Sequence, residues 1–130
     1  MRDFTDIIKD KEGFCNLKGV SQDAVEEAEN KLNLKFAGDY KDYLLKFGAA
    51  SFDGHELTGI CSSKRLNVVA VTLAERIYNP KIPNDMYVVE DTCFDGIIVW
   101  QDRTGNVYEA GSGTDAKRVS RGLAEYYQKL

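Results

Sequence analysis

Apolar residues recur every three or four positions through the first third of the chain, the spacing at which side chains share one face of an α-helix. The pattern predicts a short helix near the amino terminus, a second helix between residues 21 and 33, and a third over residues 39–47. The positions that define these three apolar faces are Phe4, Ile7, Ile8, Val25, Ala28, Leu32, Tyr40, Tyr43, Leu44 and Phe47. We therefore expect this part of the chain to supply helices that each bury one side.

Residues with strong preferences for helix ends stand at the limits of these helices. Ser21 precedes the second helix, where its hydroxyl can accept a backbone hydrogen bond. Asn33 suits the left-handed position that often ends a helix, and Gly48 follows the third helix in the same way. These residues set the expected limits of the second and third helices.

After Gly48 the helical spacing gives way to short apolar runs separated by turn residues. Strands are expected over residues 55–60, 86–90, 96–101 and 107–110, with residues 102–105 as a hairpin turn between the last two. Asn67 can cap a further helix over residues 68–78, although the β-branched residues of that segment also suit a strand.

The carboxyl-terminal part of the pattern predicts a loop followed by a closing helix. Residues 111–114 are rich in glycine and read as a loop, and a helix is expected from about residue 120 to the end. Its apolar side consists of Leu123, Tyr126, Tyr127 and Leu130. The whole pattern predicts an α+β fold, a mostly antiparallel sheet with helices packed against it, in a single domain over residues 1–130.

Composition and charge narrow the classes of partner. The formal net charge of the 130 residues is -4, so the surface repels phosphate backbones and favours a basic protein over nucleic acid. The three cysteines are widely spaced, which is typical of neither a disulfide framework nor a zinc site. The amino terminus lacks a signal-peptide pattern, and no apolar run is long enough to cross a membrane. We therefore expect a cytoplasmic chain with no membrane partner.

The densest group of acidic residues is Glu90, Asp91 and Asp95, with Asp102 on a neighbouring segment. Paired carboxylates can bind a metal ion or act as general acid and base, but here no histidine or lysine is placed to complete such a site. Solvated loop acids are the plainer interpretation. The functional interpretation that we prefer is a negative patch that faces a basic partner, with Phe94 as an exposed anchor. The predicted partner-binding residues are Glu90, Asp91, Phe94, Asp95 and Asp102.

Other candidate chemistry is weaker. His55 is the only histidine, and a polar residue at a strand start explains it better than a nucleophile pair. Residues 111–114 lack the Gly-Lys-Ser/Thr sequence of a phosphate-binding loop. Asp102, Thr104 and Asn106 alternate like calcium ligands, but the glycine and glutamate that an EF-hand needs are missing. The sequence therefore predicts no catalytic residue, metal site or cofactor.

Several segments together resemble the SUKH superfamily, the domains related to the yeast Smi/Knr cell-wall-assembly regulator. The typical pattern has an acid near the end of a capped helix, an acid–aromatic step, a helix that ends in Gly, and a strand that reaches a Gly-apolar pair. The matching positions in this chain include Glu29, Asp39, Tyr40, Tyr43, Leu44, Gly48, Gly59 and Ile60, then residues 87–91, 97–100, 105–108 and 121–130. Ala37 stands where the family usually has proline, which changes the fold little because alanine also favours helices.

The resemblance implies a protein that binds rather than catalyses. Members of the superfamily are mostly immunity proteins that bind a cognate toxin, often a nuclease, delivered by a neighbouring bacterium. Others are regulatory adaptors that bind an endogenous protein. We therefore expect an immunity protein for a basic toxin, with a regulatory adaptor as the alternative. A small metal-dependent hydrolase that uses Glu90, Asp91 and Asp95 is a third candidate.

Overall fold

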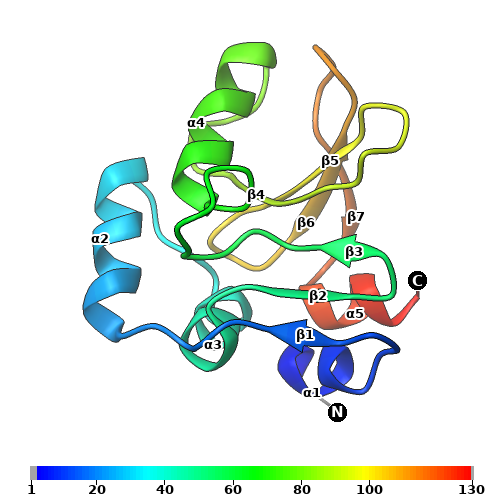
Figure 1. The fold of residues 1–130 in the computed structure, drawn as a ribbon. Coiled ribbons are helices and arrows are strands. Elements are labelled where there is room, and N and C mark those ends of the chain that lie inside the picture. Colours follow the sequence, from blue (N-terminus) through cyan, green and yellow to red (C-terminus); the bar gives the residue numbers. More distant parts are fainter. Residues whose placement is uncertain (1–2, 130) are drawn as a thin grey trace.

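The computed structural model describes residues 3–129. Within that range the chain forms five helices and seven short strands (Figure 1). In chain order they are α1 (Phe4–Lys9), β1 (Cys15–Asn16), α2 (Gln22–Leu32), α3 (Gly38–Phe47), β2 (Ala50–Phe52), β3 (His55–Glu56), α4 (Val68–Tyr78), β4 (Tyr87–Asp91), β5 (Ile98–Gln101), β6 (Val107–Ala110), β7 (Lys117–Ser120) and α5 (Leu123–Gln128). The expected α+β architecture is confirmed.

The strands form two antiparallel sheets rather than one. A small sheet has the order β1-β2-β3, and a larger sheet is a meander in the order β4-β5-β6-β7. The segment after β3 joins them, since Leu57 forms an isolated bridge with Glu90 and the Thr58 N–H donates to the Val89 carbonyl at 2.8 Å. The chain therefore passes along the edge of the larger sheet before it enters α4.

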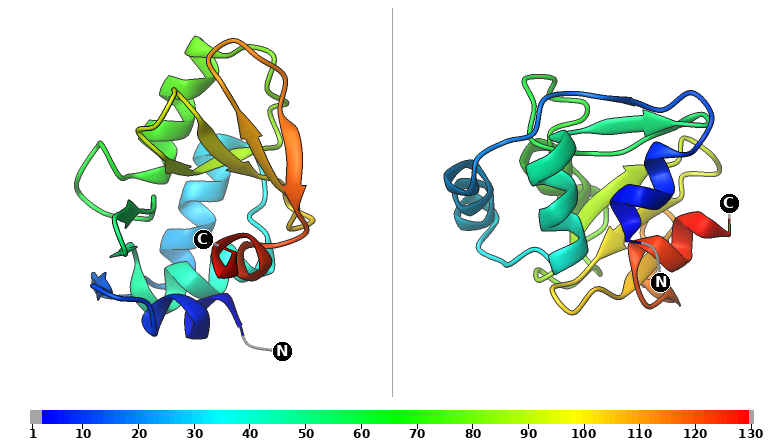
Figure 2. Two further views of the ribbon diagram at one scale, coloured as in Figure 1. Left: turned by 90° about the vertical axis from the view of Figure 1, so that its right-hand side faces the viewer. Right: turned by 90° about the horizontal axis from the view of Figure 1, so that it is seen from below.

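Helices cover both faces of the larger sheet. The helix α4 packs on one face, where Val71 contacts a small cluster that includes Ile98 and Trp100. On the other face, α1, α3 and α5 lie side by side, as the right-hand view in Figure 2, from below, shows. Trp100 is 1% exposed and lies in the core of this cluster around Val71 and Ile98. Because both faces are covered, the strands β4 and β5 are almost wholly buried.

The long, well-capped helices match the sequence predictions, and the shortest strands do not. Ser21 accepts from the Ala24 N–H, Asn67 accepts from the N–H groups of Val69 and Ala70, and Asn33 is left-handed. The predicted strand over residues 55–60 shrinks to two residues, and the last helix begins at Leu123 instead of about residue 120. The strands β1, β2 and β7 were not predicted. Two- to four-residue strands are too short to display alternation, and most of β7 is polar.

Hydroxyl groups in the core hold α3 against the connection between the sheets. The Tyr43 hydroxyl donates to the Thr58 carbonyl at 2.8 Å and accepts from the Ala50 N–H at 2.9 Å. The Thr58 hydroxyl donates to the Val88 carbonyl, so its oxygen accepts from the Tyr40 hydroxyl, again at 2.8 Å. These buried groups satisfy one another, which avoids the cost of removing them from water unpaired.

Two acids of the family pattern serve as long-range caps. Glu29 is 2% exposed, and its carboxylate accepts from the Phe36 N–H at 2.9 Å across the turn between α2 and α3. Asp39 accepts from the Leu123 N–H at 3.0 Å, at the start of α5, and from the Gln101 amide at 2.9 Å. The first turn of α5 thus receives its hydrogen-bond acceptor from α3 rather than from its own N-cap, Gly122.

Gly48 and Gly59 allow a close approach of two backbone segments. Gly48 has φ +69°, and a Cβ atom on Gly59 would lie 2.0 Å from the Gly48 carbonyl oxygen. The Ile60 N–H donates to that same oxygen at 3.0 Å. Only a residue without a side chain fits at position 59, which explains the Gly-apolar pair of the family pattern in physical terms.

Alanine at position 59 should therefore destabilise the fold strongly. The added methyl group meets backbone that cannot move without breaking the Ile60 hydrogen bond, so Gly59→Ala should lower the free energy of unfolding by about 3 kcal/mol. Gly38→Ala is the matched control, since a Cβ there meets no atom within 4 Å. The control should raise stability by about 0.5 kcal/mol. Urea denaturation followed by circular dichroism measures both, and equal effects would contradict the argument.

Alkaline pH should unfold the protein, and ionisation of its tyrosines should accompany that transition. Burial raises the pKa of Tyr43, Tyr87 and Tyr127 well above the ordinary value of 10.0. The unfolded chain can form phenolates above about pH 10 whereas the folded protein resists, so stability is intact below pH 10 and falls as the pH rises further. Phenolate absorbance and far-ultraviolet circular dichroism should change together. Ionisation of these three tyrosines in a protein with unchanged dichroism would contradict the prediction.

Candidate functional site

The five predicted partner-binding residues separate into two groups. Asp91, Phe94 and Asp95 are exposed, and the Phe94 side chain is 68% exposed. Glu90 and Asp102 are buried, at 3% and 9% exposure. The structure therefore leaves Asp91, Phe94 and Asp95 at the surface, where a partner can reach them.

Glu90 belongs to a buried hydrogen-bonded cluster and not to a solvated acidic patch. Its carboxylate accepts from the Tyr127 hydroxyl at 2.7 Å, and its other oxygen lies 2.8 Å from Nδ1 of His55. Nothing in the sequence pattern indicated this contact between His55 and Glu90. His55 contributes to this cluster from the start of β3, with about a quarter of its side chain exposed. Its role is more specific than that of a polar residue at a strand start.

A β-bulge explains why the sequence pattern misplaced Glu90. Simple alternation would put Glu90 on the same face as Val88, toward α4. The register shifts between them, because Val88 pairs with Trp100 whereas Glu90 pairs with Val99. Val89 is the extra residue, and Glu90 consequently turns toward α5. A bulge cannot be recognised from the sequence of a strand such as Tyr-Val-Val-Glu-Asp, because no residue in it is specific to a bulge.

Asp102 has a structural role in the hairpin between β5 and β6. One carboxylate oxygen accepts from the Thr104 N–H at 3.0 Å and from its hydroxyl at 2.6 Å, and the other accepts from the Tyr108 hydroxyl at 2.8 Å. The Gly105 N–H donates to the Asp102 carbonyl. The predicted hairpin turn is confirmed, and these contacts occupy both oxygens of the acid.

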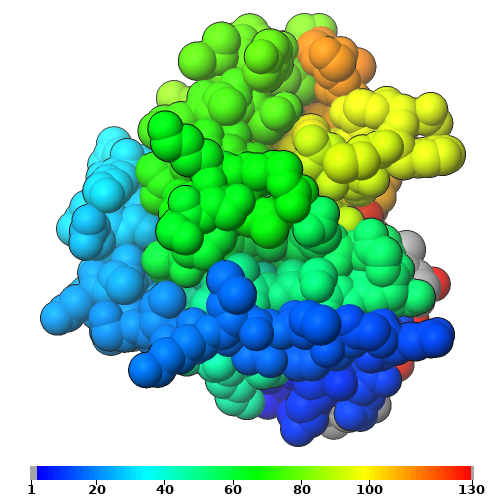
Figure 3. Space-filling model, in the orientation of Figure 1, coloured from blue at the N-terminus to red at the C-terminus, as the bar shows by residue number. Residues whose placement is uncertain are grey.

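Phe94 and Asp95 stand on the β4–β5 loop, residues 92–97, and Asp91 is the last residue of β4, directly before the loop. The Asp91 carboxylate accepts from the Cys93 N–H at 2.9 Å, and the Thr92 hydroxyl donates to the Ile97 carbonyl at 2.8 Å. Cys93 and Asp95 both have positive φ. These local turns order the loop and direct Phe94 away from the sheet, and in Figure 3 the loop (yellow) projects from the molecule.

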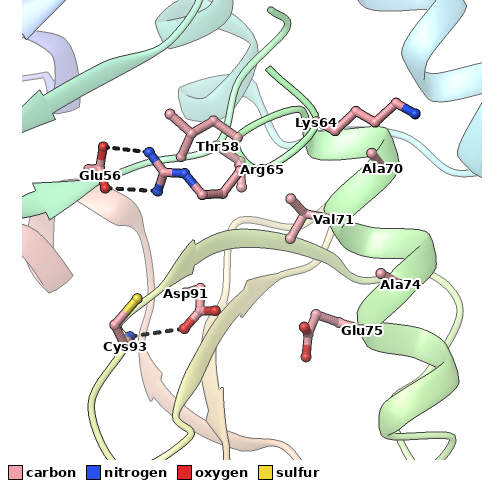
Figure 4. Close-up of a pocket in the computed structure, with 11 residues that line it drawn as sticks. Glu56, Thr58, Lys64, Arg65, Ala70, Val71, Ala74, Glu75, Asp91 and Cys93 are labelled. Atoms are coloured by element: carbon pink, nitrogen blue, oxygen red, sulfur yellow. Dashed lines mark hydrogen bonds and ion pairs between the residues drawn. The ribbon is translucent and has the colours of Figure 1, made fainter. Parts of the chain in front are cut away.

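A groove runs between this loop and α4. It consists of a pocket of about 500 Å³ and a second of about 240 Å³, which share Glu75 and Asp91 in their walls. Ala70, Ala74 and Val71 line the α4 side of the larger pocket, as Figure 4 shows. The groove therefore has an apolar helical wall and a carboxylate on each side at its middle.

The charges that line this groove cancel at one end and not in the middle. Arg65 donates two hydrogen bonds to Glu56, at 2.9 and 3.1 Å, so those two charges neutralise each other at one end. Lys64 also lines the groove, but Figure 4 shows its amine directed away from Glu75 and Asp91. Burial, reinforced by the nearby negative charge of Asp91, raises the pKa of Glu75. The middle of the groove is thus a negative site that would accept a cation.

The described residues hold no group of three or more histidine, cysteine or acidic side chains arranged to bind a metal ion. Their three cysteines are free thiols. Within residues 3–129, no helix has the length and apolar character needed to span a bilayer.

Replacement of Glu90 should destabilise the protein, whereas replacement of its neighbour should not. Glu90→Ala leaves the buried Tyr127 hydroxyl and the His55 ring without their acceptor, so the free energy of unfolding should fall by about 2–3 kcal/mol. Asp91→Ala, at an exposed position, should change it by about 0.5 kcal/mol. Urea denaturation of the two variants is the measurement. Similar values would mean that Glu90 is a surface acid after all.

A search of curated proteins finds no match to the chain. A protein-family model described as SUKH_5, SMI1-KNR4 cell-wall, matches residues 1–113, a range that includes the paired glycines and ends before β7 and α5. This match confirms the resemblance carried by Glu29, Asp39 and Gly59. The chain therefore belongs to the SUKH (SMI1-KNR4) family.

Proposed function

We propose that this chain is an immunity protein, a non-catalytic module that binds a basic toxin domain and blocks its active site. The observation that carries the proposal is the β4–β5 loop, which presents Phe94 between two exposed acids, Asp91 and Asp95. Neither acid forms an ion pair within residues 3–129. An exposed aromatic residue can serve as the anchor of a protein-binding site, and charged residues around it can steer and orient the partner.

Family membership and charge support the same conclusion. Membership of the SUKH family suggests a protein that binds other proteins, and the net charge of -4 favours a basic partner. A nuclease toxin is such a partner, because its active-site cleft must attract a polyanion. Asp91 and Asp95 would occupy the region where phosphates bind, and Phe94 would supply the apolar contact.

A regulatory adaptor is the second candidate. The description of the matching family model as a cell-wall family favours it, because that wording refers to cellular organisation and not to toxin neutralisation. The two candidates share the binding surface and differ in the partner. An immunity gene stands beside a toxin gene, whereas an adaptor gene needs no such neighbour, so the adjacent reading frame separates them.

Reversal of the loop charge should slow binding to the toxin encoded beside the gene. Asp91→Lys combined with Asp95→Lys removes the steering field, so the association rate should fall about tenfold and its dependence on salt should flatten. Asp42→Lys, a single charge reversal at an exposed position on α3, is the control for position and should leave the rate nearly unchanged. Stopped-flow measurements at several salt concentrations give both quantities.

Two outcomes would contradict this proposal in different ways. Equal association rates for the loop variant and wild type would place the interface elsewhere. Failure of the wild-type protein to bind the neighbouring gene product, or to protect cells that express it, would end the immunity proposal itself.

A further inference from the structure

The helix α4 buries one side in the protein and carries apolar residues on the opposite side as well. Val68 and Thr72 face the interior and are fully buried. The opposite side is made of residues three or four positions apart. Its three large side chains are exposed: Leu73 by 45%, Ile77 by 80% and Tyr78 by 71%. The residues of this outward face are Ala70, Leu73, Ala74, Ile77 and Tyr78. A helix at a free surface normally carries polar residues there.

The neighbouring helices show that this composition is peculiar to α4. The exposed positions of α2 include Glu26, Glu27 and Lys31, and those of α3 include Asp42 and Lys46. The two charged residues of α4, in contrast, lie off the outward face. Glu75 lines the groove, and Arg76 donates to the Asn84 carbonyl at 2.8 Å. The outward face of α4 thus presents more than two turns of helix without a charge.

This face is continuous with the acidic groove. Ala70 and Ala74 belong to the face and also line the larger pocket, while Tyr78 lines the smaller one beside Glu75 and Asp91. Figure 3 shows α4 (light green) and the β4–β5 loop (yellow) on the same side of the molecule. A polypeptide segment bound to the outward face of α4 would therefore have the carboxylates of Glu75 and Asp91 along one edge.

We propose that the outward face of α4 and the adjoining groove form the docking surface for a basic amphipathic segment of the partner protein. Apolar side chains of the segment pack on Leu73, Ile77 and Tyr78, and a lysine or arginine enters the groove between Glu75 and Asp91. This inference deepens the proposed function and rests on it, because it assigns the surface and the chemistry of the same partner. Phe94 contacts the partner from the far side of the groove.

The negative charge of Glu75 and Asp91 favours a basic partner segment over a second copy of the chain or a membrane surface. A second copy of the chain docked about a two-fold axis would present the same face to itself, and the rims of both copies carry Glu75 and Asp91. Like charges would then meet at the edge of the interface. A membrane surface is disfavoured for the same reason, since anionic lipids repel these acids. A basic partner satisfies both the apolar face and its acidic rim.

The first experiment uses an amphipathic model peptide made only of leucine and lysine at helical spacing, with a leucine–glutamate peptide as its counterpart. Calorimetry should show that the wild-type protein binds the lysine peptide and not the glutamate peptide. Leu73→Ser with Ile77→Ser should weaken binding about tenfold. Leu45→Ser, at an exposed apolar position on α3, should have no effect. Absence of binding by wild type, or equal loss in the control, overturns the inference.

The second experiment repeats the comparison with the toxin encoded beside the gene. If the toxin binds wild type and the Leu73→Ser, Ile77→Ser variant equally, the immunity proposal stands and the α4 inference fails. If the lysine peptide binds on α4 but the toxin does not bind at all, the immunity proposal fails and the α4 surface stands. Sedimentation of the protein alone should show a monomer. A dimer, or adsorption to phosphatidylserine vesicles, that the same variant abolishes would overturn the choice of occupant.

Discussion

The hydrogen bonds of Thr58 connect the two halves of the molecule. Its hydroxyl lies between Tyr40 on α3 and the Val88 carbonyl on β4, and its backbone bonds to Tyr43 and Val89. This one residue therefore fixes the distance between the helical layer and the larger sheet. Leu57 and Gly59, on either side of it, also donate backbone hydrogen bonds. Because its polar groups are paired in this way, the short connection can be buried although it is not a regular strand.

Residues 57–59 also give the neighbouring acids Glu90 and Asp91 different roles. Because residues 57–59 run along β4, the strand β3 before them brings His55 to Glu90 and the segment after them leads into α4. Glu90 is thereby committed to the core, and Asp91, one residue later, emerges at the groove. Adjacent residues of one sequence cluster thus serve two separate purposes. One holds α5 in place through Tyr127, and the other contributes charge to a surface.

The sequence was informative where a structural cause is local. Ser21, Asn33 and Asn67 act on residues within one turn, so the limits of α2 and α4 were readable. The burial of Glu90 depends on a bulge and on partners 35 and 37 residues away, and no periodicity encodes either. The outward face of α4 is an intermediate case. Its apolar residues are visible in the sequence, but most positions of the helix are apolar, so only the packing reveals which side remains uncovered.

The capping of α5 by Asp39 has a consequence for the order in which the protein is built. A six-residue helix does not persist alone, since nucleation costs more than so few hydrogen bonds return. Its acceptor for the Leu123 N–H lies 84 positions upstream, on a helix that is synthesised early. During translation, Asp39 has no such donor until residue 123 has left the ribosome. The native core is thus completed as a late event, when the end of the chain closes over its beginning.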